Sequence, residues 1–407
     1  MISDSPHLYL AAGLRRGVSL DVLNAALMQA GAVEDAALAS VLTLNHLAYQ
    51  TQTPYNFLRA VVERRRDPYR ELTIARRNGR KMRAISIPEP VLMNVHRWVL
   101  RRILAKIPTR PASYAYAPGQ SIKDCAVRHL GADWIIKLDI RSFFESIAED
   151  RVVKVFQNAG YQPLPALELA RICTRYADHA AHIDQERFRS SGRSYRAIPA
   201  YACRYRGFVP QGAPTSGALS NLVCAAMDRD LSSLASELGV VYTRYADDMT
   251  FSAPSTVIDR EKAGRLISRV AGVVRQQRFS LHSAKTRVAP PGARKIVLGL
   301  LVDGSEVRLP KRFKSRVNLH LRGVEKFGLS NHVQHVRFSS IDGFVNHVSG
   351  IIAFAKDIEP VWATDMSSRW DASLVRDGWR WASLETGRRD LASIFRNGRT
   401  VIFRGCG

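Results

Sequence analysis

A chain of 407 residues that holds 60 Lys and Arg against 36 Asp and Glu carries a formal net charge of +24 at pH 7. Its length exceeds one ordinary domain and excludes a small binding module, so we expect roughly two or three subdomains around a common centre. The excess of positive charge indicates a polyanionic partner, and because no apolar run is long enough to span a bilayer, we favour nucleic acid over a membrane and expect a cytoplasmic protein.

The N-terminal part of the chain predicts helices followed by a basic hairpin. Leucine and valine recur at helical spacing between residues 8 and 65. Residues 69–88 alternate on both sides of Asn78-Gly79, which is the strongest local signal for a β-hairpin. The cations around its tip would either be solvated or bind a triphosphate, and the candidates are Arg76, Lys81 and Arg83.

The next two segments predict an amphipathic helix and a buried strand. Residues 89–107 place apolar side chains along one broad face and Arg and Lys on the other. Residues 134–147 begin with an apolar run typical of a core strand, which reaches Asp139 and continues to Phe143-Phe144. A carboxylate at the end of a core strand is well placed to face an active-site cleft, and the alternative for this residue is a helix N-cap.

A loop rich in Gly and Pro occupies the first part of residues 207–222 and leads into a helix of small and apolar residues. It contains Gln211 and Gly212, and small side chains of this kind let a flat partner approach the backbone closely. An ordinary loop-to-helix junction would also account for the glycines and prolines. It would not account for the position of the loop between Asp139 and a later pair of carboxylates.

That pair, Asp247-Asp248, lies in a short turn within residues 242–252. Adjacent carboxylates repel each other, and the pKa of at least one of them rises unless a cation neutralises the charge. Carboxylate oxygens are the ligands that divalent metals such as Mg²⁺ prefer. A solvated acidic turn is the alternative for the pair taken alone.

The order of these segments resembles the motifs of bacterial reverse transcriptases, in the group formed by retrons and defence-associated systems. Asp139 matches motif A, residues 211–216 motif B, and the Tyr-Ala-Asp-Asp sequence at 245–248 motif C, while residues 283–286 resemble motif D and residues 297–300 the motif E primer grip. The resemblance covers about residues 55–365 and implies an α+β right-hand polymerase with an antiparallel palm sheet and mostly helical fingers and thumb. It divides the chain into an N-terminal helical extension (1–50), fingers (51–130), a palm (131–304) with a fingers-like insertion at about 160–206, a thumb (305–370) and a basic C-terminal tail (371–407).

By this resemblance, Asp139, Asp247 and Asp248 are catalytic and hold two Mg²⁺ ions, with Mn²⁺ as a substitute. In a two-metal scheme, one ion lowers the pKa of the primer hydroxyl and the other binds the triphosphate. Phe144 matches the position where an aromatic ring excludes a 2′-hydroxyl, although a core Phe would fit the pattern as well. The other implied nucleotide contacts are Gln211, Gly212, Lys285 as a proton donor to pyrophosphate, and the hairpin cations.

The C-terminal part predicts a nucleic-acid-binding thumb helix. Residues 308–327 carry seven bases against one acid, with apolar residues at helical spacing, so the helix either lies against a duplex or presents a solvated basic face. Residues 350–360 resemble the last thumb helix of retron enzymes, and Trp379 and Trp381 in the tail either stack on RNA or pack. The candidates for phosphate contacts are Lys311, Arg312, Lys314, Arg316 and Arg322.

Two retron signatures are altered, since Cys125 stands where retrons have Asn and Leu298 where they have Thr. We therefore expect an RNA-directed DNA polymerase that copies a cognate noncoding RNA in antiphage defence. Its expected partners are that RNA, the RNA–DNA duplex, dNTPs and a separate effector protein. Two alternatives stay open: a true retron enzyme that makes branched RNA-DNA, and a catalytically retired RNA-binding scaffold.

Overall fold

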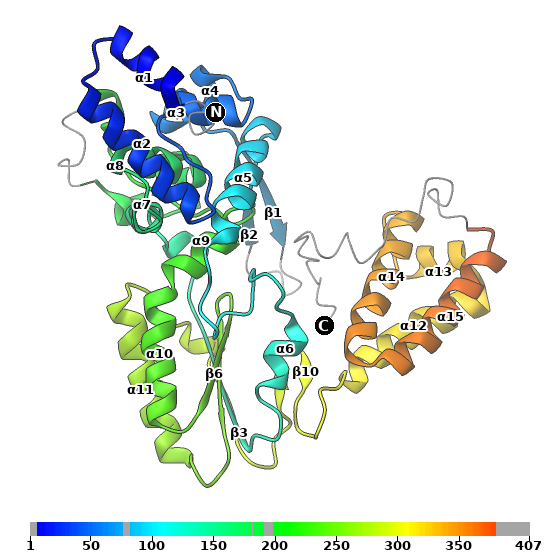
Figure 1. Ribbon diagram of the computed structural model, residues 1–407. Coiled ribbons are helices and arrows are strands. Elements are labelled where there is room, and N and C mark those ends of the chain that lie inside the picture. Colours follow the sequence, from blue (N-terminus) through cyan, green and yellow to red (C-terminus); the bar gives the residue numbers. More distant parts are fainter. Residues whose placement is uncertain (1–5, 76–81, 181, 191–197, 380–407) are drawn as a thin grey trace.

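The computed structural model describes residues 6–75, 82–180, 182–190 and 198–379. Figure 1 shows helices of the N-terminal part grouped at the top, a twisted sheet with long helices beside it below, and a separate group of helices at the right. None of the helices in these ranges is long and apolar enough to cross a membrane. The chain combines helices with small antiparallel sheets, as the α+β expectation requires.

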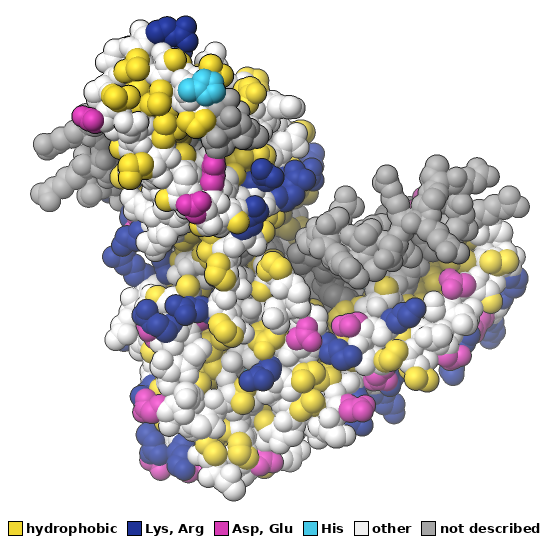
Figure 2. Space-filling view, viewed as in Figure 1, with side chains coloured by type: hydrophobic (Ala, Val, Ile, Leu, Met, Phe, Trp, Pro, Cys, Tyr) yellow, Lys and Arg dark blue, Asp and Glu magenta, His cyan; other side chains and the backbone are white. Residues whose placement is uncertain are grey.

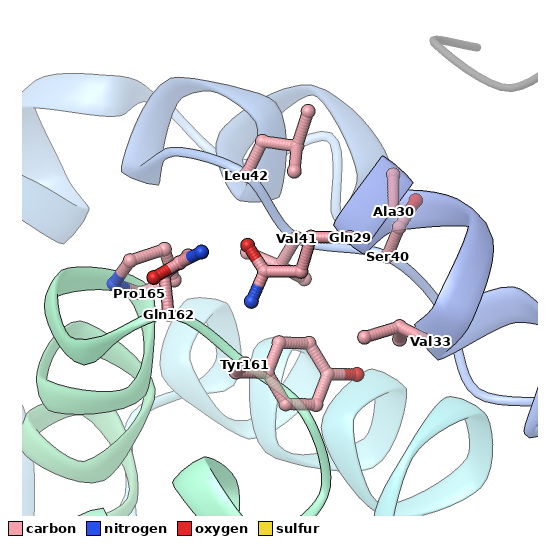
Figure 3. A pocket seen from close by; sticks show the side chains of 9 residues that line it. All are labelled: Gln29, Ala30, Val33, Ser40, Val41, Leu42, Tyr161, Gln162 and Pro165. Atoms are coloured by element: carbon pink, nitrogen blue, oxygen red, sulfur yellow. The ribbon is translucent and has the colours of Figure 1, made fainter. Parts of the chain in front are cut away.

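The N-terminal helices pack on a pair of helices from the middle of the chain. The Gln29 side chain donates a hydrogen bond to the Gly160 carbonyl at 2.6 Å, and the Tyr161 hydroxyl donates to the Ala39 carbonyl at 2.5 Å. Figure 3 shows these side chains around a cavity of about 10 Å³, which is too small for a substrate. The elements concerned are α1 (Pro6–Arg15), α2 (Leu20–Asp35), α3 (Leu44–Gln50), α4 (Tyr55–Val62), α7 (Glu149–Asn158) and α8 (Pro163–Cys173).

The predicted basic hairpin is confirmed. Strands β1 (Tyr69–Ala75) and β2 (Met82–Pro88) pair antiparallel, with Ile74 opposite Arg83. The tip residues Arg76 and Lys81 lie outside the described residues. Helix α5 (Pro90–Arg102) follows with the 3-10 turn η1 (Leu104–Lys106), and its apolar face is buried as the amphipathic pattern predicts.

The central sheet has four antiparallel strands in the order β6-β7-β3-β8. Side chains alternate along β3, so Ile136 and Leu138 enter the main core with helices α10 and α11, while Ile135 packs in a second cluster that includes Ala126 of α6. The bounds are β3 (Trp134–Asp139), β6 (Val241–Tyr245), β7 (Asp248–Ala253), β8 (Arg287–Ala289), α6 (Ile122–Val127), α10 (Ala225–Glu237) and α11 (Arg260–Gln276).

Short elements connect the larger ones. Strands β4 and β5 pair beside a small aromatic cluster that contains Tyr176, Phe188 and Phe208, and β9 and β10 form a tight hairpin. The bounds are β4 (Arg175–Tyr176), β5 (Gly207–Phe208), β9 (Ile296–Val297), β10 (Leu300–Leu301), α9 (Ser216–Val223) and the 3-10 turns η2 (Phe144–Ser146), η3 (Ala177–His179), η4 (Gln185–Phe188), η5 (Pro199–Tyr201) and η6 (Ser283–Lys285).

The region expected to be the thumb consists of helices around a core of its own, in which Val317, Phe344 and Trp370 are buried. The helices are α12 (Lys311–Phe327), α13 (Leu329–His335), α14 (Ile341–Ile358) and α15 (Pro360–Arg376). Residues 350–358 form the second half of α14, so the prediction that residues 350–360 make the last thumb helix is wrong. Trp379 packs against this core, which favours packing over RNA stacking for that residue, and Trp381 lies outside the described residues.

Candidate active site

The three candidate carboxylates belong to residues at one end of the central strand pair. Asp139 is the last residue of β3 and lies directly opposite Asp248, the first residue of β7. Asp247 belongs to the two-residue turn between β6 and β7, and its carbonyl accepts a hydrogen bond from the Ile140 amide at 3.0 Å. The N-cap interpretation of Asp139 is wrong, because the residue ends a strand and no α-helix begins beside it.

The turn that carries Asp247 has an unusual backbone. Ala246 has a φ of 57°, in the left-handed region that Gly, Asn and Asp adopt more readily than alanine. Such a conformation costs about 1 kcal/mol or more and persists only where its surroundings hold it. Here the Arg244 guanidinium donates a hydrogen bond to the Ala246 carbonyl at 3.0 Å.

The charges of the site are not balanced within the protein. Burial, together with the charges of Asp248 and Asp139, raises the pKa of Asp247 to about 6. Burial also raises the pKa of Asp248. Asp139 is buried, and while its Oδ2 accepts a hydrogen bond from Lys285 Nζ at 2.6 Å, its Oδ1 has no hydrogen-bond partner. A cation beside these oxygens would offset both the repulsion and the unsatisfied acceptor.

These residues fit a divalent metal by their chemistry. Three carboxylates at one strand end supply the hard oxygen ligands that Mg²⁺ prefers, and one buried oxygen lacks a partner. Within the described ranges, however, no three Asp, Glu, His or Cys side chains are already gathered closely enough to hold a metal ion. The donor set is therefore present, and the carboxylates would have to close around an ion.

A buried arginine that the sequence analysis did not single out supports this site. The side chains of Arg244 and Asp228 are both 0 % exposed, and the guanidinium donates to both carboxylate oxygens at 2.8 and 2.7 Å. Its other hydrogen bonds reach Ala246, Asn221 of α9 and Ser113. Although burial alone would lower the pKa of Arg244, the charge of Asp228 raises it above its ordinary value. The only sign in the sequence is a charged residue inside a β-prone run.

Comparison with known protein families identifies the family to which this chain belongs. The family model described as "Reverse transcriptase (RNA-dependent DNA polymerase)" matches residues 75–300. The chain belongs to the reverse transcriptase family. This confirms the resemblance seen in the sequence and the right-hand polymerase fold that it implied.

Several curated relatives of this reverse transcriptase come from retrons. The retron Mx162 reverse transcriptase of Myxococcus xanthus is 34 % identical over 60 % of this chain and 50 % of its own length. The retron Ec86 reverse transcriptase of Escherichia coli is 28 % identical over 72 % of this chain and 81 % of its own. The match thus spans about half the length of the Mx162 protein. Among solved structures, telomerase from Candida albicans aligns over 78 % of this chain and 63 % of its own at 12 % identity, with a TM-score of 0.40.

In this reverse transcriptase, the motif B loop contacts the basic hairpin. The Ser86 amide of β2 donates a hydrogen bond to the Gln211 carbonyl at 2.8 Å. Gly212 has a φ of 120°, and a Cβ on it would lie 2.6 Å from Ile85 Cγ2 and 2.8 Å from the Ser86 carbonyl oxygen. Only glycine fits this approach. The structure therefore brings Gln211 and Gly212 to the strand that also carries Arg83.

The candidate thumb cations differ in their surroundings. Lys314 pairs with Glu359 at 2.5 Å and lies over the Trp362 ring, and Arg316 is half-buried against Phe313. Both are occupied within the protein. Among the five candidates, Lys311, Arg312 and Arg322 have exposed side chains, and Figure 2 shows Lys and Arg side chains along the lower edge of the thumb.

Proposed function

We propose that this chain is an RNA-directed DNA polymerase in which Asp139, Asp247 and Asp248 bind two Mg²⁺ ions. The observation that carries the proposal is the pairing of Asp139 with Asp248 beside a buried carboxylate oxygen that has no partner. The raised pKa of Asp247 supports it, because a site built for cations leaves its carboxylates in mutual repulsion when no cation is present. A retired scaffold would have no use for such a set.

The chain's own residues would act as follows. When bound, the metal ions would supply charge stabilisation for the primer oxygen and for the leaving pyrophosphate. The carboxylates bind and orient, and the Arg244 network holds the turn that presents Asp247. Lys285, which reaches the site through its contact with Asp139, is the candidate to give a proton to the pyrophosphate as the new ester bond forms.

We propose further that the template is a cognate noncoding RNA in a retron-like system with an antiphage role and a separate effector protein. The names of the curated relatives support the retron part. At the first altered signature, Cys125 is buried and its thiol donates a hydrogen bond to the Thr243 hydroxyl at 3.4 Å, so the fold accommodates cysteine at this position. Leu298 likewise lies in the tight β9–β10 turn with a φ of 49°.

Incorporation of dNTPs on an RNA template tests the catalytic proposal. We expect Mg²⁺-dependent DNA synthesis by the wild type and a loss of several orders of magnitude in rate for Asp247→Asn. The matched control is Asp259→Asn, because Asp259 caps α11 from an exposed position and Asn caps a helix equally well. An Asp247→Asn enzyme within about tenfold of the control would refute the assignment.

Sequencing the nucleic acid that copurifies with the protein tests the template. A single abundant small RNA with cDNA attached to it is the expected result. A DNA–RNA branch would identify a true retron enzyme, whereas a bound RNA together with a wild type that incorporates no dNTP would favour the scaffold.

A further inference from the structure

Tyr116 lies against Phe144, the residue proposed to exclude ribonucleotides. The two rings meet edge to face, with centroids 6.1 Å apart and planes at 61°. Phe144 also contacts the buried Phe143, at 5.4 Å between centroids. Phe144 is thus in contact both with a core ring and with the ring of Tyr116, which is 45 % exposed.

The first turn of α9 is shaped to receive the Tyr116 ring. A Cβ on Gly217 would lie 2.4 Å from Cγ and 2.6 Å from Cδ1 of Tyr116, so any larger residue would displace the ring. Glycine is a weaker helix former than alanine, so its presence at this position favours the close approach of the aromatic ring over helix propensity.

The backbone also holds Tyr116 in place. Its φ is 56°, a strained value for an aromatic residue. The residues before it are anchored, because the Asn221 side chain donates to the Ala115 carbonyl at 2.6 Å and the Ser113 hydroxyl donates to the Asn221 side chain at 2.9 Å. A strained residue held by such anchors indicates a position where the side chain has a defined task.

We propose that Tyr116 is a positioning residue for sugar selection, which holds the Phe144 ring at the tilt that rejects a 2′-hydroxyl. The inference rests on the proposed polymerase function. Since the edge of one ring limits the movement of the other, the loss of Tyr116 lets Phe144 tilt away and admits a ribonucleotide more easily. Gly217 sets the place of Tyr116, and through it the tilt of Phe144.

The experiment measures kcat/KM for a dNTP and for the matching rNTP on one primer–template. For Tyr116→Ala we expect discrimination between the two to fall by about three- to tenfold, the scale of one aromatic contact, while kcat for the dNTP stays within about threefold. Tyr116→Phe keeps the ring and should keep discrimination. The matched control is Tyr49→Ala, which removes a tyrosine that is 74 % exposed on α3.

Two further variants show whether Tyr116 acts through Phe144. The double variant Tyr116→Ala/Phe144→Ala should discriminate no worse than Phe144→Ala alone, since residues that act as a unit are not additive. Introduced alone, Gly217→Ala should weaken discrimination. Combined with Tyr116→Ala it should have no further effect, because the new methyl group then meets no aromatic ring. Thermal unfolding of each variant confirms that it is folded.

Discrimination within about twofold of the wild type for a folded Tyr116→Ala, or additive losses in the double variant, would overturn the inference and leave the polymerase function standing. A wild type that incorporates no dNTP on RNA would remove the proposed function and this inference with it.

Discussion

Replacement of Arg244 tests whether the buried network holds the catalytic turn. Arg244→Met removes five hydrogen bonds to four residues and leaves the Asp228 carboxylate buried, with Tyr242 as its remaining hydrogen-bond donor. Breaking a buried ion pair by removing one partner costs about 3–5 kcal/mol, because the other charge stays uncompensated. We expect a loss of that size in the free energy of unfolding, measured by urea denaturation at neutral pH.

Two comparisons separate this effect from the loss of an ordinary ion pair. Arg269→Met removes an equally short contact to Glu237, but both side chains are about half exposed, so this variant should lose far less stability than Arg244→Met. The double variant Arg244→Met/Asp228→Asn removes the stranded charge and keeps an acceptor for Tyr242, and it should be more stable than Arg244→Met alone by about 2 kcal/mol.

Arg244→Met should also lower the rate of polymerisation. Without its contact to the Ala246 carbonyl, the strained turn loses a donor that holds it, so the rate per folded molecule should fall at least about tenfold in the stabilised double variant as well. The reasoning is refuted if Arg244→Met costs no more stability than Arg269→Met, or if the folded double variant polymerises at the wild-type rate.

Three further outcomes are expected. His129 bridges Thr243 and Ser252 at 2.7 Å each, and burial lowers its pKa from 6.5 to about 4, so only the unfolded chain takes up its proton between these values. As the pH drops from 6.5 to 4, the free energy of unfolding should therefore fall, and His129 should account for up to about 3 kcal/mol of that fall. Urea titrations of His129→Gln should show a smaller fall over the same pH range. A fall equal to that of the wild type would contradict the assignment. With a chelator present and above pH 6, Asp247→Asn should raise the free energy of unfolding by up to about 3 kcal/mol, because the raised pKa of Asp247 means that its negative charge opposes folding at such pH. A variant less stable than the wild type would contradict the repulsion between the carboxylates. Arg322→Ala should reduce the salt dependence of duplex affinity by about one charge, whereas Lys314→Ala should reduce it less, and equal slopes would contradict the difference drawn from the Glu359 ion pair.

The sequence predicts most of the fold where local pattern and tertiary environment agree. The paired strands that flank Asn78-Gly79, the strand that ends on Asp139 and the amphipathic helix α12 are present as expected, because each has a local pattern that agrees with its surroundings: an apolar run for the buried β3 and one apolar stripe for α12. Pro360 marks the start of α15 in the sequence, but the packing of this helix on the thumb core could not be predicted from local pattern.

The candidate site shows the same division. Asp139 and Asp248 were found through motif spacing, and their direct pairing in the sheet agrees with it. Arg244 and Tyr116 were not found, because what distinguishes them is contact with residues far along the chain, such as Asp228 and Gly217. The ion pair of Lys314 with Glu359 was hidden for the same reason, since charge alone does not tell a surface cation from an occupied one.

The hydrophobic core of the thumb helices affects which amino-acid substitutions the protein can tolerate. Helices α12 to α15 bury their own apolar cluster, and Glu359 between α14 and α15 ties the base of this region by accepting from the Leu309 amide at 2.8 Å. The candidate nucleic-acid surface of α12 is therefore carried by helices that have a core of their own, while Ala355, Ile358 and Ala363 at their base pack in the same cluster as Ile135 of β3. Under the proposed function, substitutions of the exposed cations on α12 would alter RNA recognition without removing a buried contact to the sheet, so recognition and chemistry could evolve at different speeds.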